Sequence, residues 1–262
     1  MTTIPKREEI LFSLDELKEV SQNFTTELKD SFRGEKTSLA FLKNTLPKTS
    51  LVEKGERFQV MAIGGSNFET GIMVRGDKGF ELSEYYREPL MLLETKEILL
   101  ELILRNLHSD IELLNINFAY PIEALSRDGL LEGRLVGISK EHKLEGLMHK
   151  QVGEEVEKEV LKKTGSKIRV SVANDTVCLL LAGLNMDKRE NLVGGIVGTG
   201  MNFSIFIDET TVVNLESGNF DKFEMTQSGI LVDEKSNDKG RQKFEKEISG
   251  GYLFRHYNAL IK

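Results

Sequence analysis

The stretch FQVMAIGGSNFETGIMV, residues 58–74, decides the fold of this chain. Two apolar runs, 58–63 and 68–74, flank a Gly-Gly turn, and this pattern predicts two strands joined by a tight connection. A second stretch of the same kind, LVGGIVGTGMNFSIFI at residues 192–207, places a Gly-Thr-Gly turn between two further apolar runs. The repetition predicts that the chain begins the same sheet architecture twice.

Helices and strands alternate in the rest of the chain. A capping box at Ser13 starts a long amphipathic helix that continues to Gly34. The elements predicted after residue 74 are a short strand near Phe80, a helix over 90–107, a strand over 113–118, a helix over 147–163 ending at Gly165, a strand over 168–173, a helix over 176–184, a strand over 211–213 and one helix-like stretch over 239–260. This order predicts an α/β fold, an RNase H-like layer of the actin-type ATPase fold.

The patterns divide the chain into three predicted segments. Residues 10–48 hold the N-terminal helix, which we expect to pack on a large domain. Residues 49–172 form a small domain with one complete layer, and residues 173–262 begin the large domain with a truncated second layer. The predicted strand over 192–197 then has an unpaired edge, which is an expected site of association.

Composition excludes several classes of function. The chain has 262 residues, 39% of them hydrophobic, which is enough for a sizeable core. A net charge of −7 argues against a nucleic-acid partner. No apolar stretch approaches the roughly 20 residues needed to cross a bilayer, and the N-terminus lacks a secretion signal, so we expect no membrane partner and a cytoplasmic location. The single cysteine, Cys178, lies in an apolar run and is expected to pack rather than react.

Five short polar motifs occur in one order along the chain. They are GGSNF at 64–68, ISK at 138–140, VANDT at 172–176, GTGMN at 198–202 and FEKEISGGY at 244–252. Together they resemble the sugar kinases of the hexokinase and glucokinase family, over nearly the whole chain. The resemblance implies ATP-dependent phosphorylation of a hexose, with glucose expected, at the 6-hydroxyl, as in the first step of glycolysis. ATP and Mg²⁺ are the implied cofactors, and the sequence does not indicate an oligomeric state.

Asp175 follows a predicted strand and precedes a predicted helix, which suits either a helix cap or a general base. The family resemblance favours the base. Lys140 matches the lysine that contacts the sugar and the transferring phosphate, and is the second predicted catalytic residue. The residues predicted to bind the sugar are Ser139, Lys140, Asn174, Asp175, Asn202, Glu216 and Glu245. A carboxylate is a good acceptor for paired sugar hydroxyls.

Two glycine turns are the predicted phosphate cradle, because glycine lets the backbone approach a phosphate closely. The residues involved are Gly64, Gly65, Ser66 and Asn67 in the first turn and Thr199 and Gly200 in the second. No protein ligand to a metal is predicted. We expect magnesium to be held mainly by the nucleotide phosphates and water.

The chain departs from the family pattern at three places. Ala62 stands where the family has an aspartate near the magnesium, Glu69 replaces an arginine, and Ala119 replaces a serine that contacts the sugar. Nothing resembles the family's second phosphate loop and adenosine pocket, so the expectation is a fragment of a longer protein. We predict weak metal-dependent turnover at best.

Two alternatives stay open at this point. One is a degenerate sugar-binding sensor or regulatory protein without kinase activity. The other is a different member of the actin-like superfamily, acting on acetate or as an ATPase. That second alternative does not account for Glu216 and Glu245.

Overall fold

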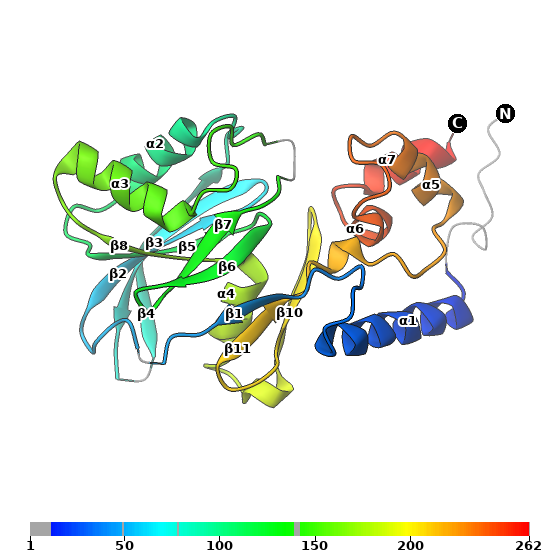
Figure 1. Cartoon of the computed structure of the whole chain (residues 1–262). Helices are drawn as coiled ribbons and strands as arrows, with labels where there is room; N and C mark the ends of the chain where they lie inside the picture. Colours follow the sequence, from blue (N-terminus) through cyan, green and yellow to red (C-terminus); the bar gives the residue numbers. More distant parts are fainter. Residues whose placement is uncertain (1–11, 49, 78, 139–141, 262) are drawn as a thin grey trace. The chain divides into compact units, whose positions relative to one another are not determined.

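The computed structural model describes residues 12–48, 50–77, 79–138 and 142–261 (Figure 1). These residues belong to two compact units, and each is discontinuous in sequence. Unit 1 takes residues 1–41, 195–203 and 214–262, and unit 2 takes residues 42–194 and 204–213. The predicted division at residues 48/49 and 172/173 follows chain order instead, and it stays a prediction.

A five-stranded sheet forms the centre of unit 2. Its order is β4 (Phe80–Pro89), β3 (Asn67–Arg75), β2 (Arg57–Ile63), β5 (Leu113–Phe118) and β8 (Arg169–Ala173). Strands β2, β3 and β4 form an antiparallel meander, and β5 and β8 run parallel to β2. The predicted turn between β2 and β3 is present, with Ile63 opposite Phe68.

Two helices, α2 (Lys96–Asn106) and α3 (Val152–Thr164), cover one face of this sheet (Figure 1). Their apolar sides and the sheet enclose the largest hydrophobic core, in which Ile63, Phe68 and Ile103 are fully buried. Both helices begin later than predicted, because Thr95 caps α2 and the sheet-facing stripe of α3 begins at Val152. Gly165 ends α3 in the left-handed conformation, as expected for a C-terminal glycine.

A second sheet has the order β1 (Leu42–Thr45), β11 (Thr211–Asn214), β10 (Met201–Phe206) and β9 (Val193–Val197). The order confirms the prediction that the apolar strand near residues 192–197 lies at a sheet edge. A hairpin of β6 (Ile122–Arg127) and β7 (Leu130–Leu135) belongs to unit 2. Helix α4 (Asp175–Gly183) packs its apolar side against side chains of β7 and β11.

Unit 1 holds most of the remaining helices. The capping box at Ser13 is present and starts α1 (Leu14–Phe32). Further along are the short 3₁₀ turn η3 (Ser217–Asn219), α5 (Gln227–Glu234), α6 (Lys243–Ile248) and α7 (Leu253–Leu260). A second 3₁₀ turn, η2 (Arg189–Asn191), lies in unit 2.

The single helix expected over residues 239–260 is wrong, because α6 and α7 are separate. The backbone N–H groups of Gly250 and Gly251 donate to the carbonyls of Gly198 and Thr199, 2.7 and 3.0 Å away. Amide groups that donate to this turn cannot also donate to helical carbonyls, so one continuous helix cannot pass through Gly250 and Gly251. Helix α5, capped by Thr226, was not predicted.

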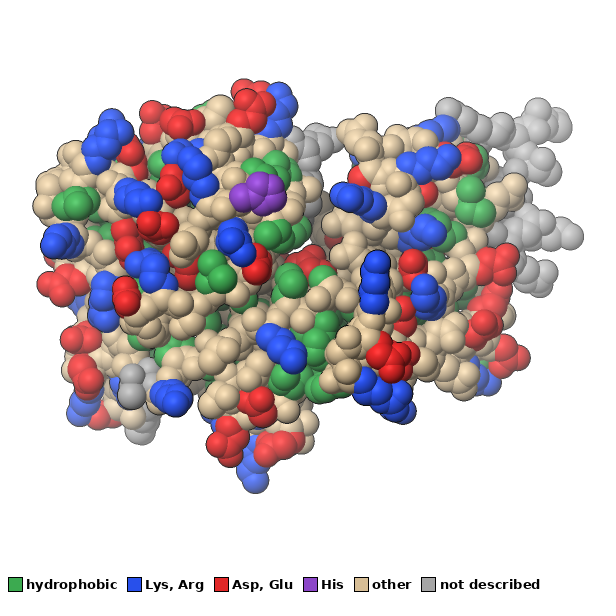
Figure 2. Space-filling view, in the orientation of Figure 1, with side chains coloured by type: hydrophobic (Ala, Val, Ile, Leu, Met, Phe, Trp, Pro, Cys, Tyr) green, Lys and Arg blue, Asp and Glu red, His purple; other side chains and the backbone are tan. Residues whose placement is uncertain are grey.

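The expectations about membrane-spanning segments and about surface charge can be compared with the structure. No helix among the described residues combines the length and the apolar character that crossing a bilayer requires. On the face drawn in Figure 2, acidic and basic side chains are interspersed.

Candidate functional site

A chain of amide and carboxylate side chains links two predicted sugar ligands in unit 1. Asn202 in β10 donates from Nδ2 to Oδ1 of Asn214, at 2.7 Å, and Asn214 donates from Nδ2 to Oε1 of Glu216, at 2.8 Å. Glu216 lies just after β11 with its backbone in the left-handed region, at φ 48°. That conformation turns the chain sharply and returns the carboxylate toward Asn214. Asn202 also accepts the Ser217 N–H through Oδ1, at 3.1 Å.

Glu245, the third predicted sugar ligand in unit 1, lies in the first turn of α6. Its Oε2 accepts the backbone N–H of Met201 at 2.9 Å, next to Asn202. Two glycines make room for it. A Cβ added to Gly200 would lie 2.5 Å from Oε2, and one added to Gly218 would lie 3.0 Å from the Cβ of Glu245. The structure therefore brings Asn202, Glu216 and Glu245 together within one unit.

The second glycine turn is tied to the segment that follows Glu245. Gly198 donates to the carbonyl of Gly200 at 2.8 Å, which closes the turn that contains Thr199. The Gly250 and Gly251 amides bond to this turn, and a Cβ on Gly251 would lie 2.4 Å from the Thr199 carbonyl oxygen. The close backbone approach therefore requires glycine at position 251. This approach connects Thr199 and Gly200, which are predicted to bind the nucleotide, to the segment that follows Glu245.

In unit 2, Asn174 and Asp175 start helix α4. Asn174 is the N-cap, and its Oδ1 accepts from the backbone N–H and the hydroxyl of Thr176, at 3.0 and 2.7 Å. The Thr176 hydroxyl also bonds to Ser204 at 2.6 Å, and both of these side chains are fully buried. Asp175 is the first helical residue, where the helix dipole stabilises a negative charge. Asn174 is thus the cap, but Oδ1 of Asp175 also accepts the Thr176 N–H, at 2.9 Å, and the role of Asp175 as a base stays a prediction.

The first glycine turn, also in unit 2, is held by backbone and by two aromatic side chains. Gly64 donates to the Asn67 carbonyl at 3.1 Å, and the Ser66 carbonyl accepts from the N–H of Leu90 at 3.0 Å. The Tyr120 hydroxyl donates to the Gly64 carbonyl at 3.4 Å. Burial raises the pKa of Tyr120, so its hydroxyl stays protonated.

His142 supports the same turn from the other side. Its Nδ1 accepts the Leu93 N–H at 2.9 Å, which leaves Nε2 as the protonated nitrogen, 3.5 Å from the Gly65 carbonyl oxygen. The ring of His142 meets the ring of Tyr120 edge to face, with centroids 5.7 Å apart. The predicted cradle at Gly64, Gly65, Ser66 and Asn67 is therefore a preformed turn.

The three departures from the family pattern have defined surroundings. Ala62 and Glu69 are direct cross-strand partners on β2 and β3. The Glu69 carboxylate accepts from the Tyr85 hydroxyl at 2.8 Å and lies 3.6 Å from Nε of Arg87, so this acid group is engaged on the β4 side. Ala119 is buried after β5. The predicted residues Ser139 and Lys140 lie outside the described residues.

Among the residues that the structure describes, no group of three or more His, Cys, Asp or Glu side chains is arranged to hold a metal ion. The thiol of Cys178 donates to the Ala173 carbonyl at 3.8 Å. Burial, with a smaller effect of the Asp175 charge, raises the pKa of Cys178 to about 12, so the thiol does not become a nucleophile near neutral pH.

Several residues that shape these sites were missed by sequence reasoning. They are Asn214, Ser204, Thr176, Tyr120 and His142. Asn214 had a usable signal, because it stands two residues before Glu216 in the N-x-E pattern. Ser204, Tyr120 and His142 act through contacts distant in sequence, which no local pattern reports. Thr176 combines such a contact, with Ser204, with a hydrogen bond to Asn174 two residues away.

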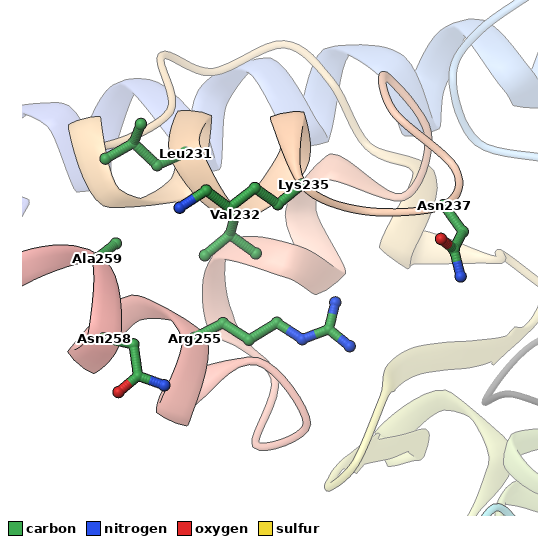
Figure 3. Close-up of a pocket in the computed structure, with 7 residues that line it drawn as sticks. All are labelled: Leu231, Val232, Lys235, Asn237, Arg255, Asn258 and Ala259. Atoms are coloured by element: carbon green, nitrogen blue, oxygen red, sulfur yellow. The ribbon is translucent and has the colours of Figure 1, made fainter.

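Two surface hollows of the described residues lie apart from the predicted ligands. In unit 1, a cavity of about 320 Å³ lies between α5 and α7, lined by Leu231, Val232, Lys235, Asn237, Arg255, Asn258 and Ala259 (Figure 3). In unit 2, a larger and shallower hollow is lined by residues 184–190, 192–193 and 205–209. Neither lining includes a residue predicted to bind sugar or nucleotide.

The architecture is that of the actin-type sugar kinases. The structure superposes on the hexokinase from Schistosoma mansoni, solved in complex with glucose, with a TM-score of 0.75 and 22% identity, covering 97% of this chain and 64% of that one. A second solved hexokinase gives a TM-score of 0.66 at 22% identity, covering 94% of this chain and 63% of that chain. This likeness defines the fold.

Two sequence models described as Hexokinase match residues 6–184 and 192–255, and the chain therefore belongs to the hexokinase family. Hexokinase-1 of Spinacia oleracea is 27% identical over 278 residues, covering 92% of this chain and 55% of the relative. Hexokinase-2 of Candida albicans is 24% identical over 286 residues, covering 95% of this chain and 58% of the relative. The chain thus spans little more than half the length of these curated relatives.

Proposed function

We propose that this chain binds a hexose, with glucose as the expected one, and contributes to its ATP-dependent phosphorylation at the 6-hydroxyl. The observation that carries the proposal is the cluster of three predicted ligands in unit 1 of a hexokinase-family chain. Asn202 and Glu216 are linked by hydrogen bonds through Asn214, and Glu245 accepts the backbone N–H of Met201, next to Asn202. Carboxylate and amide groups held in one place match the paired donors and acceptors of a monosaccharide.

The other roles follow from the family assignment. Asn174, Ser139 and Lys140 complete the sugar contacts, and Asp175 accepts the proton of the attacking hydroxyl. Asp175 belongs to unit 2, whereas Glu216 and Glu245 belong to unit 1.

For the nucleotide, Gly64 to Asn67 and Thr199 to Gly200 are the proposed phosphate contacts. When bound, ATP with Mg²⁺ supplies the phosphoryl group and neutralises charge on it. The closed glycine turns support this assignment, and the magnesium would arrive with the phosphates. The expected cytoplasmic location and the role in glycolysis stay predictions.

Replacing Asp175 with alanine tests the proposed base. We expect the Asp175→Ala chain to lose phosphorylation of glucose while still binding glucose, because the base acts on the hydroxyl proton rather than on affinity. A coupled assay of ADP release measures the turnover, and calorimetry measures the binding. The exposed Asp187, which bonds only locally in the described contacts, provides the matched control Asp187→Ala. Full turnover by Asp175→Ala would refute the role of Asp175.

A sugar-binding sensor without kinase activity is the second candidate function. It is favoured by Ala62 and Glu69, which are cross-strand partners beside the first glycine turn. Ala62 stands where the family pattern has an aspartate, and Glu69 stands where it has an arginine. The same calorimetry separates the two functions. Heat on adding glucose but none on adding ATP–Mg²⁺, together with no turnover, would favour the sensor.

A further inference from the structure

Lys246, the residue after Glu245, carries a buried charge. Its side chain is fully buried, and its Nζ lies 2.7 Å from Oδ1 of Asp233 and 2.9 Å from Oδ1 of Asp238. The same nitrogen donates to the backbone carbonyl of Asp238, also at 2.9 Å. An ammonium group has three donors, and three acceptors surround it here.

Asp233, at the end of α5, completes the ion pair. Both of its carboxylate oxygens accept the Gly240 N–H at 3.0 Å. Burial pushes the pKa of Asp233 upward, but the Lys246 hydrogen bond, the Gly240 amide and the ammonium charge together outweigh it, so the pKa lies below its ordinary value. The carboxylate is therefore ionised near neutral pH.

Helix α6 depends on such contacts for its position. It has six residues and its N-cap makes no side-chain hydrogen bond, and a helix of this length has little stability of its own. The Lys246 side chain ties it to the end of α5. Its backbone is tied as well, because Nε2 of His256 donates to the Lys246 carbonyl at 2.8 Å while Nδ1 of His256 bonds to Ser228 at 2.9 Å.

The direction of Lys246 also sets the direction of Glu245. Consecutive side chains on a helix diverge by about 100°, so fixing one fixes the other. Glu245 tolerates little displacement, because its carboxylate fits against Gly200 and accepts from Met201. A buried ion pair is not required for stability alone, since apolar replacements of similar volume often serve as well.

We propose that Lys246, held by Asp233 and Asp238, is a positioning residue that aims the Glu245 carboxylate at the hexose. It does not contact the sugar itself. The sugar-binding role of Glu245 rests on the proposed function, whereas the orientation of Glu245 by Lys246 can be tested without any sugar.

The first test is hydrogen exchange of the Met201 amide in the 262-residue chain. We expect Lys246→Met to speed that exchange by roughly tenfold or more, because the amide loses its charged acceptor. Glu245→Ala is the positive control. If Lys246→Met does not fold, the double variant Asp233→Leu/Lys246→Met replaces it, since it removes the ion pair without leaving Asp233 unpaired. An unchanged Met201 exchange rate in a folded variant overturns the proposal.

The matched control is another lysine–carboxylate pair, remote from the predicted ligands. Lys96 lies 2.7 Å from Glu155 in unit 2. Lys96→Met should leave the exchange of the Met201 amide unchanged. An equal acceleration in Lys96→Met would mean that the effect is general loosening, and it would also overturn the proposal.

The second test measures glucose affinity by calorimetry. We expect Lys246→Met to weaken glucose binding by about tenfold in the otherwise unchanged chain. It should have no further effect in the Glu245→Ala chain, because both changes remove the same contact between Glu245 and the sugar. Equal losses in both backgrounds would show that Lys246 does not act through Glu245. If the unchanged chain binds no glucose, the proposed function fails, and the Met201 exchange still decides whether Lys246 orients Glu245.

Discussion

The side chain of Asn214 hydrogen-bonds to two predicted sugar-binding residues. It is 1% exposed, and it receives a hydrogen bond from Asn202 while donating one to Glu216. An asparagine amide both donates and accepts, so a single residue can orient one neighbour of each kind. The orientation of the Glu216 carboxylate thus depends on a residue that does not itself belong to the predicted sugar contacts.

Replacing Asn214 with alanine should weaken glucose binding by roughly tenfold, because both Asn202 and Glu216 lose a buried partner. Calorimetry on the folded chain measures the change. The exposed Asn191 belongs to unit 2 and bonds to Asp187, and Asn191→Ala is the control with no expected change. Unchanged affinity in Asn214→Ala would show that the amide is not needed to hold Glu216.

At the scale of elements, α6 is a short helix with little stability of its own, and a buried ion pair fixes its position. Its short length makes tertiary contacts decisive, and the ion pair of Lys246 with Asp233 provides one that depends on pH. The pKa of Asp233 is lower in the folded than in the unfolded chain. Its stabilising contribution is therefore complete above the unfolded pKa, near pH 4, and is lost as the pH falls through the folded pKa.

We therefore expect the free energy of unfolding to fall more steeply below about pH 4 in the unchanged chain than in Asp233→Leu/Lys246→Met, which lacks the linked carboxylate. Urea unfolding at a series of pH values measures both curves. Parallel curves below pH 4 would show that the ion pair contributes no acid sensitivity.

At the scale of the whole molecule, apolar surface is left exposed on several elements. The edge strand β9 exposes 65% of Val193 and 59% of Val197, and α7 exposes Leu253, Phe254 and Tyr257 to a similar extent. An open sheet edge beside apolar side chains favours pairing with another chain. The sequence predicted association at this edge, and that association stays a prediction.

Val193→Lys should reduce concentration-dependent association of the chain, because a lysine on an edge strand opposes pairing with a second strand. Sedimentation velocity over a range of protein concentrations measures the effect. Glu190→Gln, which also raises the net charge by one unit at an exposed residue of the nearby η2 turn, controls for the change in net charge. Association that persists equally in both variants would exclude the β9 edge as its cause.

The sequence by itself determined the α/β class, the capping box of α1, the diglycine hairpin of β2 and β3, the C-terminal end of α3 at Gly165, and both ends of β5. These features depend on periodicity and on glycine or cap residues within a few positions, so local patterns report them. It also indicated Asn202, Glu216 and Glu245 through ordered motifs. The sugar-binding roles of these three residues, like the roles of Asp175, Ser139 and Lys140, are still predictions.

Only the tertiary structure decided how Glu245 is held. The amide that it accepts belongs to Met201, 44 residues earlier in the chain, and the break between α6 and α7 arises because Gly250 and Gly251 bond to a turn some 50 residues earlier. Lys246 reads as an ordinary charged residue in the sequence, yet it is buried against Asp233. Contacts between distant segments form when the chain packs, and no short pattern encodes which charged side chain will be enclosed.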